Sequence, residues 1–369
     1  MWKSGTKICW HASSTTGNVK FAAGSMANLF KDCSTFTNID LTGFDTSAVN
    51  NMAHMFDGCL NLQSVDLTGC STGNVKDMSY MFYKAGYNDI PSTKTQGSQK
   101  QLIKKSNTHY LNIIGLDGFN TEKVTNMAYM FSVCSAQNLN VSSFDASYVT
   151  NFSHMFAGEC TANYSDYWPT KFTSLDVAGW NVGGNIGNDK WIDMSNMFDI
   201  CNMVETIILT DDPSSTTKGW KFGRVTTMKE MFNRCESVTS IVFPKYTDLT
   251  YVTTMLSLFN RDQQIPLTGS GSFTDIFSRW DISGNDYNGG PSDPENPPIG
   301  GGMQFTSPVI GYGDDSPNRL MQDTEALKHL ASVRFDTYTS NIKVEIGSVN
   351  GSLKIENQRL KKVKIVNNP

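Results

Sequence analysis

The sequence is poor in charged residues, and neither sign is in large excess. Asp, Glu, Lys and Arg make up 18% of the 369 residues, against about 25% in an average protein. The net charge of −5 argues against a nucleic-acid-binding protein, because such proteins usually carry a basic stripe. Uncharged Asn, Ser, Thr and Gly take the place of charge, which is typical of β-rich repeat proteins and of extracellular or virion proteins.

Long apolar runs are also lacking. No run approaches the roughly 18 residues of a transmembrane helix, so we expect no membrane insertion. The N-terminal stretch Met1–Lys7 does not open the apolar segment of a secretory signal. We therefore expect either a removed signal with a new Met added, or a protein that reaches its destination without one.

Catalytic motifs are missing as well. There is no Walker box, no dinucleotide fingerprint and no Gly-x-Ser-x-Gly frame around Ser270. Cysteines and histidines are not grouped at zinc spacing, and the segment from Asp281 to Gly289 lacks the closing Glu of a calcium loop. The sequence therefore predicts no enzyme, no cofactor and no metal site.

A repeat is the main feature that is present. The motif [Asn/Asp/Ser/Thr]-Met-x-x-Met-Phe-x-x-Cys returns at a period of 26 residues, from Met26 to Met52 and again to Met78. A fixed period in the twenties indicates stacked supersecondary units, each of which buries its apolar face against its neighbours.

Each copy of the motif predicts a short helix. Apolar residues at i, i+3 and i+4 form one face of a helix, and the residue before each copy is a favoured N-cap. We expect eight such helices, which begin at Met26, Met52, Met78, Met127, Phe152, Met194, Met228 and Met255 after the caps Ser25, Asn51, Asp77, Asn126, Asn151, Asp193, Thr227 and Thr254.

Each unit also contains a predicted strand. Apolar–polar–apolar alternation follows the motif, as in Ile39–Leu41 and Val65–Leu67, and indicates a strand with one buried face. An aromatic residue, a turn and a Val then lead to the next cap. The predicted fold class is an α/β repeat, with a parallel β-sheet on one face and short helices on the other.

The cysteines follow the repeat. Five share the motif position and Cys160 is displaced from it by one residue; the five are Cys33, Cys59, Cys134, Cys201 and Cys235. Neighbouring rungs lie about 5 Å apart, so a disulfide is not excluded by distance. We favour buried free thiols that act as small apolar groups, which points to folding in a reducing compartment.

Insertions and a different C-terminal part break the period. We expect an N-terminal cap (1–24), repeats over 25–283 with insertions, a Gly/Pro-rich linker (284–318) and a small β-rich capping or docking module (319–369). The insertions cover about 84–110, 161–171, 182–190, 211–221 and 260–272. In the last module we predict a helix over 324–332 and strands over 333–338, 342–346, 353–356 and 362–366. Three insertions emerge on one edge, which makes them either a functional surface or tolerated drift. An enzyme would need acid and base residues that converge from 84–110 and 161–171.

Candidate partner-binding residues lie on the sheet and in the first insertion. We expect the exposed mid-strand position to hold, among others, Asp40, Asp66, Gly115, Asp176, Ile208 and Val242, and the insertion to present Lys94, Lys100, Lys104 and Lys105. Stacked acidic residues need hydrogen bonds, a cation or a basic partner. The change from acidic to apolar predicts that another module or chain covers the late strands. His54 and His154 share one motif position about four rungs apart, too far to share a metal.

The stretch Phe44–Leu67 resembles the 26-residue repeat of BspA-like bacterial surface proteins, which are relatives of leucine-rich-repeat (LRR) proteins. The resemblance covers about residues 20–282 and weakens in the copies that begin at Phe152 and Met255. It implies an LRR-like solenoid and adhesion to proteins or cells, and no catalytic residues carry over. Phages of gut bacteria also carry such repeats, and their virion proteins need no signal.

We therefore expect a non-enzymatic recognition or structural protein displayed on an exterior surface. A phage virion component (decoration, tail or adsorption protein) that binds protein or glycan partners ranks first, because no signal is visible. The alternative is a bacterial cell-surface adhesin that binds host proteins. Expected partners are other protein chains of a virion or surface assembly, with a host-cell protein, a glycan and a homo-oligomer left open, and no nucleic acid.

Overall fold

The computed structural model describes residues 24–88, 110–160, 168–187, 189–210, 220–235, 237, 238 and 241 with their side chains. Outside these ranges it describes only the backbone of short strands. We number the described repeats 1 to 7 by the first residue of each motif, in the order Met26, Met52, Met78, Met127, Phe152, Met194 and Met228.

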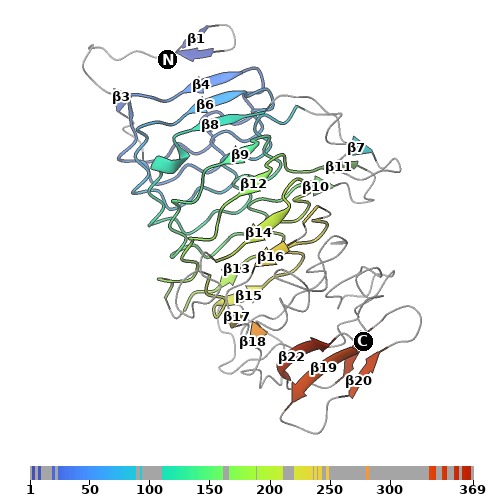
Figure 1. Cartoon of the computed structure of the whole chain (residues 1–369). Helices are drawn as coiled ribbons and strands as arrows, with labels where there is room; N and C mark the ends of the chain where they lie inside the picture. The colour runs from blue at the N-terminus through green and yellow to red at the C-terminus, as the bar shows by residue number, and fades with distance from the viewer. Residues whose placement is uncertain are drawn as a thin grey trace.

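Each repeat contributes one short strand to what we call the strand face, and these strands lie one above the other (Figure 1). The strands are β4 (Asn38–Asp40), β6 (Ser64–Asp66), β8 (Asn112–Ile114), β9 (Asn138–Leu139), β12 (Ser174–Leu175), β14 (Thr206–Ile208) and β16 (Ser240–Val242). All pairings within this series are parallel: β4 with β6, β6 with β8, β9 with β12 and β14 with β16. The predicted parallel strands are confirmed.

The alternation of side chains explains the strand register. Ile39 pairs with Val65, Leu139 with Leu175, and Ile207 with Ile241. All six side chains are buried, while the described neighbours of Ile39, Val65, Leu139, Leu175 and Ile207 along their strands are at least partly exposed. Because successive strand residues point to opposite faces, a slip of one residue would expose this apolar row.

The N-terminal segment extends the sheet. Strands β1 (Trp2–Ser4) and β2 (Lys7–Cys9) form an antiparallel pair, and β2 pairs with β4 in parallel, so the sheet order is β1-β2-β4-β6-β8. Strand β3 (Val19–Lys20) pairs with β5 (Phe44–Asp45). These pairings place parts of the predicted cap against repeat 1.

The predicted helices are wrong for the seven described repeats. Among the described residues the only helical element is one short 3-10 turn, η1 (Leu116–Gly118), and it lies outside the motif. In repeat 1 every second N–H of the motif donates to repeat 2 instead: Met26 N to Asn51 O at 2.8 Å, Asn28 N to Ala53 O at 2.9 Å, and so on. The eighth predicted helix, at Met255, lies outside the described residues.

Stacking of the repeats is the physical reason. An α-helix needs each N–H to bond the carbonyl four residues back, but here alternate N–H groups bind the next repeat. Other N–H groups close four-residue turns, as Leu29 N does to Met26 O at 3.2 Å. One residue in the middle of each motif has a left-handed φ, from 54° to 60°; these residues are Asn28, His54, Tyr80, Tyr129, His154, Asn196 and Glu230. We call the surface formed by these motifs the turn face.

The predicted capping residues do cap, although they close turns rather than helices. A side-chain oxygen accepts the backbone N–H two residues later, for example Asn51 Oδ1 from Ala53 N at 2.8 Å and Asp193 Oδ1 from Ser195 N at 2.8 Å. All seven described capping residues make this bond. These residues were therefore correctly predicted to accept a backbone N–H, because Asx turns and helix N-caps use the same kind of hydrogen bond.

Aromatic rings form the core between the two faces. The motif Phe residues stack in one column, Phe30, Phe56, Phe82, Phe131, Phe156, Phe198 and Phe232, with ring centroids 5.1 to 5.9 Å apart. A second column packs beside the first and holds Phe119, Phe144, Trp180 and Trp220 at 6.1 to 6.3 Å; Trp180 lies 6.0 Å from Phe156. Burial of each ring contributes about 2–3 kcal/mol to the free energy of folding, because it removes apolar surface from water. Neighbouring repeats therefore stabilise one another when they stack.

The described cysteines are free thiols, and Cys59, Cys70, Cys134, Cys201 and Cys235 are buried. Three of them donate S–H to the carbonyl of the motif Phe in the preceding repeat, at 3.0 to 3.1 Å. Burial raises the pKa of the Cys59 and Cys134 thiols to about 12. The ladder cysteines therefore pack as small apolar groups.

The remaining strands lie beside and beyond the described repeats. Strand β13 (Ile192–Asp193) pairs with β15 (Val225–Thr227), and β17 (Thr247–Asp248) pairs with β18 (Trp280–Asp281). Four strands occur in the predicted C-terminal module: β19 (Ser332–Thr337) with β22 (Leu360–Val366), and β20 (Lys343–Ile346) with β21 (Leu353–Glu356), both antiparallel. They agree with the predicted strands. The linker over 284–318 and residues 324–331 of the helix predicted over 324–332 lie outside the described residues, and Ser332, the last residue of that helix, begins β19 instead.

The described residues include no helix whose length and apolar character would let it span a membrane.

Candidate functional site

The predicted acidic residues of the strand face are used to close turns. Asp40 lies directly opposite Asp66 in the register. Asp40 Oδ1 accepts hydrogen bonds from the Thr42 N–H at 2.8 Å and the Thr42 hydroxyl at 2.7 Å, and Asp66 Oδ1 accepts from Thr68 N at 2.9 Å. These bonds meet the need of stacked carboxylates without a cation.

The predicted change from acidic to apolar residues along the strand face is wrong at one position, the one assigned to Gly115. The register puts Ile114, not Gly115, opposite Asp66, and Ile114 is 39% exposed. Gly115 instead begins the 3-10 turn with a φ of 89°. The long insertion before β8 breaks the period, so counting along the sequence slipped by one residue.

One of the two late strand positions carries an exposed apolar residue. Ile208 is 40% exposed and lies opposite Val242 in the register. The side chain of Val242 and the residues Lys94, Lys100, Lys104 and Lys105 lie outside the described part of the chain.

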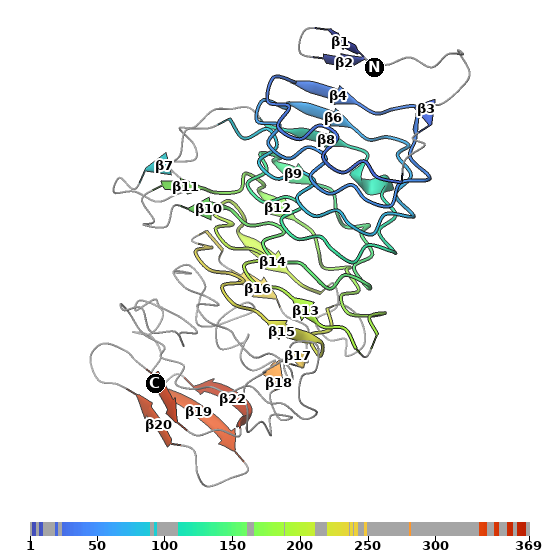
Figure 2. The ribbon, with the colours of Figure 1, turned by 180° about the vertical axis from the view of Figure 1, so that it is seen from behind.

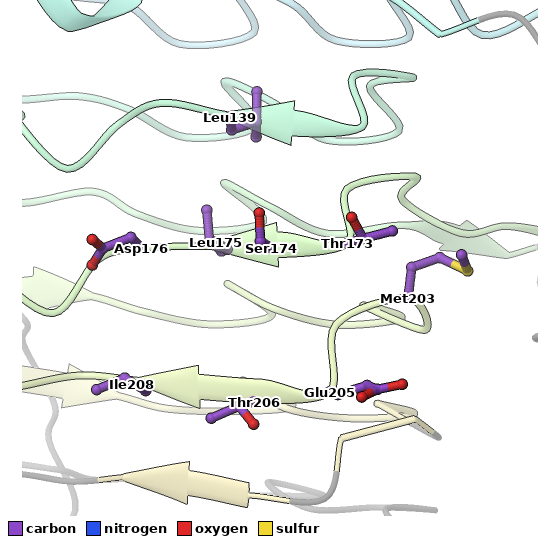
Figure 3. A pocket seen from close by; sticks show the side chains of 9 residues that line it. All are labelled: Leu139, Thr173, Ser174, Leu175, Asp176, Met203, Glu205, Thr206 and Ile208. Atoms are coloured by element: carbon purple, nitrogen blue, oxygen red, sulfur yellow. The ribbon is translucent and has the colours of Figure 1, made fainter.

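The strand face is interrupted between repeats 5 and 6. Strand β12 pairs with β9 and β14 pairs with β16, but β12 and β14 belong to different sheets. An open groove of about 610 Å³ lies between them (Figure 3). Its lining consists of Leu139, Thr173, Ser174, Leu175, Asp176, Met203, Glu205, Thr206 and Ile208.

Strands β8 and β9 also belong to different sheets, although an isolated bridge joins Leu111 to Ala136 there. Between repeats 5 and 6 the interruption is limited to the strand side. On the turn side His154 N still donates to Ser195 O at 3.0 Å and Phe156 N to Met197 O at 2.9 Å. Directly after β12 the indole N–H of Trp220 donates to Val177 O at 2.9 Å. The two repeats therefore stay joined on the turn side and next to the strand, so the groove is a surface feature above an intact core.

The groove combines apolar side chains with negative charge. Asp176 and Glu205 are exposed, and no Lys, Arg or His is among the lining residues. Asp176 Oδ1 accepts a bond from Ala178 N at 3.2 Å. Asp176 lies at the Ile208 end of the groove and Glu205 at the Met203 end (Figure 3).

The turn face carries a column of polar aromatic rings. His54, Tyr80, Tyr129 and His154 occupy the left-handed position in repeats 2 to 5. Their rings stack with centroids 4.5, 4.5 and 4.3 Å apart, and all four are partly exposed. The two histidines are therefore three repeats apart rather than four, and tyrosine rings fill the space between them. The sequence analysis did not predict this ring stacking, because in the predicted helices this motif position was treated as a variable surface position.

Charged groups flank the aromatic column. Asp57 pairs with Lys31, and also with His54 Nδ1 at 2.7 Å. Tyr83 lies edge-on to Tyr80 and donates its hydroxyl to Glu159.

Burial sets the protonation of the column. It raises the pKa of Tyr129 to about 12 and raises that of Tyr83, while it lowers the pKa of His154. The middle of the column is therefore uncharged at neutral pH.

A buried carboxyl group lies at the late end of the turn face. Asp199 accepts hydrogen bonds from Asn233 Nδ2 at 2.8 Å and from Asn196 Nδ2 at 3.2 Å. Asn196 also donates to Glu230 at 3.0 Å. Burial raises the pKa of Asp199 to about 7, a shift that Arg234 reduces and Glu230 increases. Both oxygens of Asp199 accept amide hydrogens, so the network is structural.

Two of the predicted insertions meet each other. Strand β7 (Ser92–Thr93) of the first pairs antiparallel with β11 (Asp166–Trp168) of the second, which in turn pairs with β10 (Glu159–Cys160). This small sheet stands out from one side of the stacked repeats in both views (Figures 1 and 2). At its base the buried Lys171 ammonium lies 4.8 Å from the Tyr87 ring and 5.8 Å from the Tyr110 ring.

Within the described ranges, no group of three or more His, Cys, Asp and Glu side chains could hold a metal ion. The predicted site residues are thus not brought together into one centre: Asp40 and Asp66 lie in the first sheet, and Asp176 and Ile208 line the groove.

Comparison with known proteins gives one family. Three overlapping segments, residues 15–103, 98–206 and 192–286, match the model described as "Mycoplasma protein of unknown function, DUF285". They span the region in which the sequence predicts repeats. No curated protein and no solved structure matches the chain.

Proposed function

This chain belongs to the DUF285 family of Mycoplasma proteins, and we propose that it is a non-enzymatic recognition protein displayed on an exterior surface. In this proposal the repeats form an LRR-like solenoid, a scaffold that grows in one dimension and presents long faces to other protein chains. The BspA-like resemblance of Phe44–Leu67 belongs to the same proposal.

The groove between β12 and β14 is the observation that carries the proposal. Asp176 accepts a backbone N–H of its own turn, as Asp40 and Asp66 do elsewhere on the strand face. In the groove an open volume, the exposed carboxylates of Asp176 and Glu205 and the exposed Ile208 side chain occur together. Such a combination of apolar and charged groups in a concave surface is typical of recognition sites.

We place the protein on a phage particle, as a decoration, tail or adsorption protein. The support is chemical: the described cysteines are free and five of them are buried, which fits folding in a reducing compartment. Virion proteins assembled in a bacterial cytoplasm fold under such conditions. The family description, which refers to a cellular bacterium, favours the alternative of a bacterial cell-surface adhesin.

Immunogold labelling with an antibody against residues 25–283 separates the two placements. Gold on purified particles supports the virion component, and gold on intact cells without particles supports the adhesin. Recognition itself is tested by competition: an excess of the purified full-length chain should block attachment of the particle or cell that carries it. Unchanged attachment at saturating protein would refute a recognition role.

Deletion of residues 84–110 tests whether the paired insertions take part. A variant that competes as well as the intact chain would leave this loop outside the recognition surface.

A further inference from the structure

We propose that the strand face is a self-association surface, on which a second copy of this chain docks with its repeats in the opposite order. The two copies are related by a twofold axis that runs parallel to the strands, at the level between repeats 4 and 5. This inference rests on the proposed recognition function, because it names a second copy as the partner that the groove between β12 and β14 accepts.

Two exposed isoleucines supply the first argument. Ile114 ends β8 in repeat 3 and Ile208 ends β14 in repeat 6, and their side chains are 39% and 40% exposed. The isoleucine before each of them packs in or against the core, so strand alternation directs Ile114 and Ile208 outward. Repeats 3 and 6 lie the same number of repeats from the proposed axis. Each copy therefore brings its Ile114 onto the Ile208 of the other, and this contact occurs twice.

The groove gives this contact its depth. Ile208 lies at one end of the open volume between β12 and β14, together with Asp176 (Figure 3). Leu139 and Leu175 also line the groove, so its floor is partly apolar. The Ile114 side chain of the second copy enters the Ile208 end and removes apolar surface of both residues from water.

Charge selects this alignment of the repeats. Asp66 of repeat 2 faces repeat 7 and Glu205 of repeat 6 faces repeat 3, whose strands carry no charged residue. Asp176 of repeat 5 faces Asn140 of repeat 4, whose carboxamide can donate a hydrogen bond to it. A shift by one repeat puts Asp176 opposite its own copy in one direction and opposite Ile114 in the other. Because like charges placed opposite each other are destabilising, the unshifted alignment is favoured.

The rest of the face is uncharged, polar and self-complementary. The outward residue that begins each described strand is Asn, Ser or Thr, namely Asn38, Ser64, Asn112, Asn138, Ser174 and Thr206. Such side chains both donate and accept hydrogen bonds, so they can pair with their own kind. These strands contain no Lys, Arg or His, and the Asp residues of the face already accept N–H groups of their own turns. An acidic partner finds no counter-charge there, whereas a second copy needs none.

The overlap has the size of a small specific interface. Repeats 2 to 7 lie within it, and their strands, about 4.8 Å apart, cover roughly 29 Å of height. About six residues of each repeat cross the strand face, which corresponds to roughly 20 Å of extended chain. The contact therefore buries about 600 Å² per copy, or about 1,200 Å² in total, at the lower limit of standard interfaces. We expect a reversible dimer of micromolar affinity.

Sedimentation of the full-length chain with a reductant present, over about 1 to 200 µM, tests the proposal, since this range brackets the affinity expected for such an interface. Ile114→Lys and Ile208→Asp should each raise the dimer dissociation constant at least about tenfold, because each substitution removes two apolar contacts. Tyr148→Asp is the matched control. Tyr148 is 46% exposed but lies in a turn outside the strand face, so this variant should dimerise as the parent does.

The double variant Ile114→Lys/Ile208→Asp separates the proposed arrangement from other dimers. In the proposed dimer each introduced ammonium group meets an introduced carboxylate of the other copy, so the double variant should dimerise more tightly than either single variant. A double variant no tighter than the single ones overturns the proposal, and so do single variants that dimerise as the parent does. A parent that stays monomeric also overturns it, and would mean that another partner or another part of the chain covers Ile208.

The competition assay keeps this proposal apart from the recognition function. If the full-length chain blocks attachment but stays monomeric, only the self-association has failed. If the chain dimerises but does not block attachment, the recognition function has failed and the self-association stands.

Discussion

Replacing Asp199 by Asn should change how the stability of repeats 6 and 7 depends on pH. Burial raises the pKa of this carboxyl group from an ordinary 3.8 to about 7 in the folded chain. The folded state therefore binds more protons than the unfolded state between about pH 4 and pH 7. Stability must fall as the pH rises through this range and level off above pH 7.

The expected size follows from the shift. One pKa unit corresponds to about 1.36 kcal/mol, so the whole effect is about 4 kcal/mol, of which about 2.5 kcal/mol falls between pH 5 and pH 8. The variant has no carboxyl group at this position and loses this dependence. At pH 5 it should be less stable than the parent by about 1–2 kcal/mol, because its amide N–H₂ meets the donor Asn196. Towards pH 8 this difference should shrink or reverse.

Amide hydrogen exchange measures the effect locally, since repeat proteins open in parts. The Phe198 N–H donates to Met231 O at 2.8 Å and reports on the joint between the two repeats. After correction for the intrinsic exchange rate, its protection in the parent should fall roughly 70-fold more from pH 5 to pH 8 than in the variant. Glu122→Gln, which removes an exposed carboxyl group, controls for the loss of one negative charge. Equal pH dependence in parent and Asp199→Asn would refute the reasoning.

Two further predictions concern the core and the turns. At pH 8 iodoacetamide should label the partly exposed Cys33 first and leave Cys59 and Cys134 unreacted until the chain is unfolded, because burial and a pKa of about 12 keep both as thiols; rapid labelling of Cys59 in the folded chain, read by mass spectrometry, would contradict this. Gly86→Ala should lower the free energy of unfolding by at least about 2 kcal/mol more than Gly43→Ala. Both glycines have a left-handed φ, but a Cβ on Gly86 would lie 2.3 Å from a serine oxygen and 2.7 Å from a carbonyl, whereas Gly43 has nothing within 4 Å. Equal losses in thermal unfolding would show that backbone strain alone decides both.

The repeat motif shows which structural features can be predicted from residue spacing within one repeat. Apolar spacing at Met52, Met55 and Phe56 correctly identified buried residues, and the cap at Asn51 correctly identified a chain turn. The helix was wrong because i, i+3, i+4 spacing suits a series of turns equally well. A helix and a series of turns differ in whether alternate N–H groups bond to a neighbouring repeat. The carbonyl groups that accept these bonds lie about 25 residues further along the sequence, as Asn51 O does for Met26 N.

The candidate site was predicted only in part. Asp176 and Ile208 were identified as exposed strand positions, and both line the groove. Glu205 and Met203 were not identified, because no motif distinguishes them from other loop residues. The missing pairing between β12 and β14 has no signal in either strand, since each one alternates like its neighbours.

The sequence by itself determined the period, the parallel strands, the buried columns and the hydrogen-bonding caps, because these depend on residue type and spacing within one repeat. Tertiary structure decided the rest. It turned predicted helices into turns, stacked His54, Tyr80, Tyr129 and His154 into one column, joined two distant insertions in one small sheet and opened the groove. Each of these depends on how one repeat satisfies the backbone of the next, and such pairing between distant segments is not encoded in any local pattern.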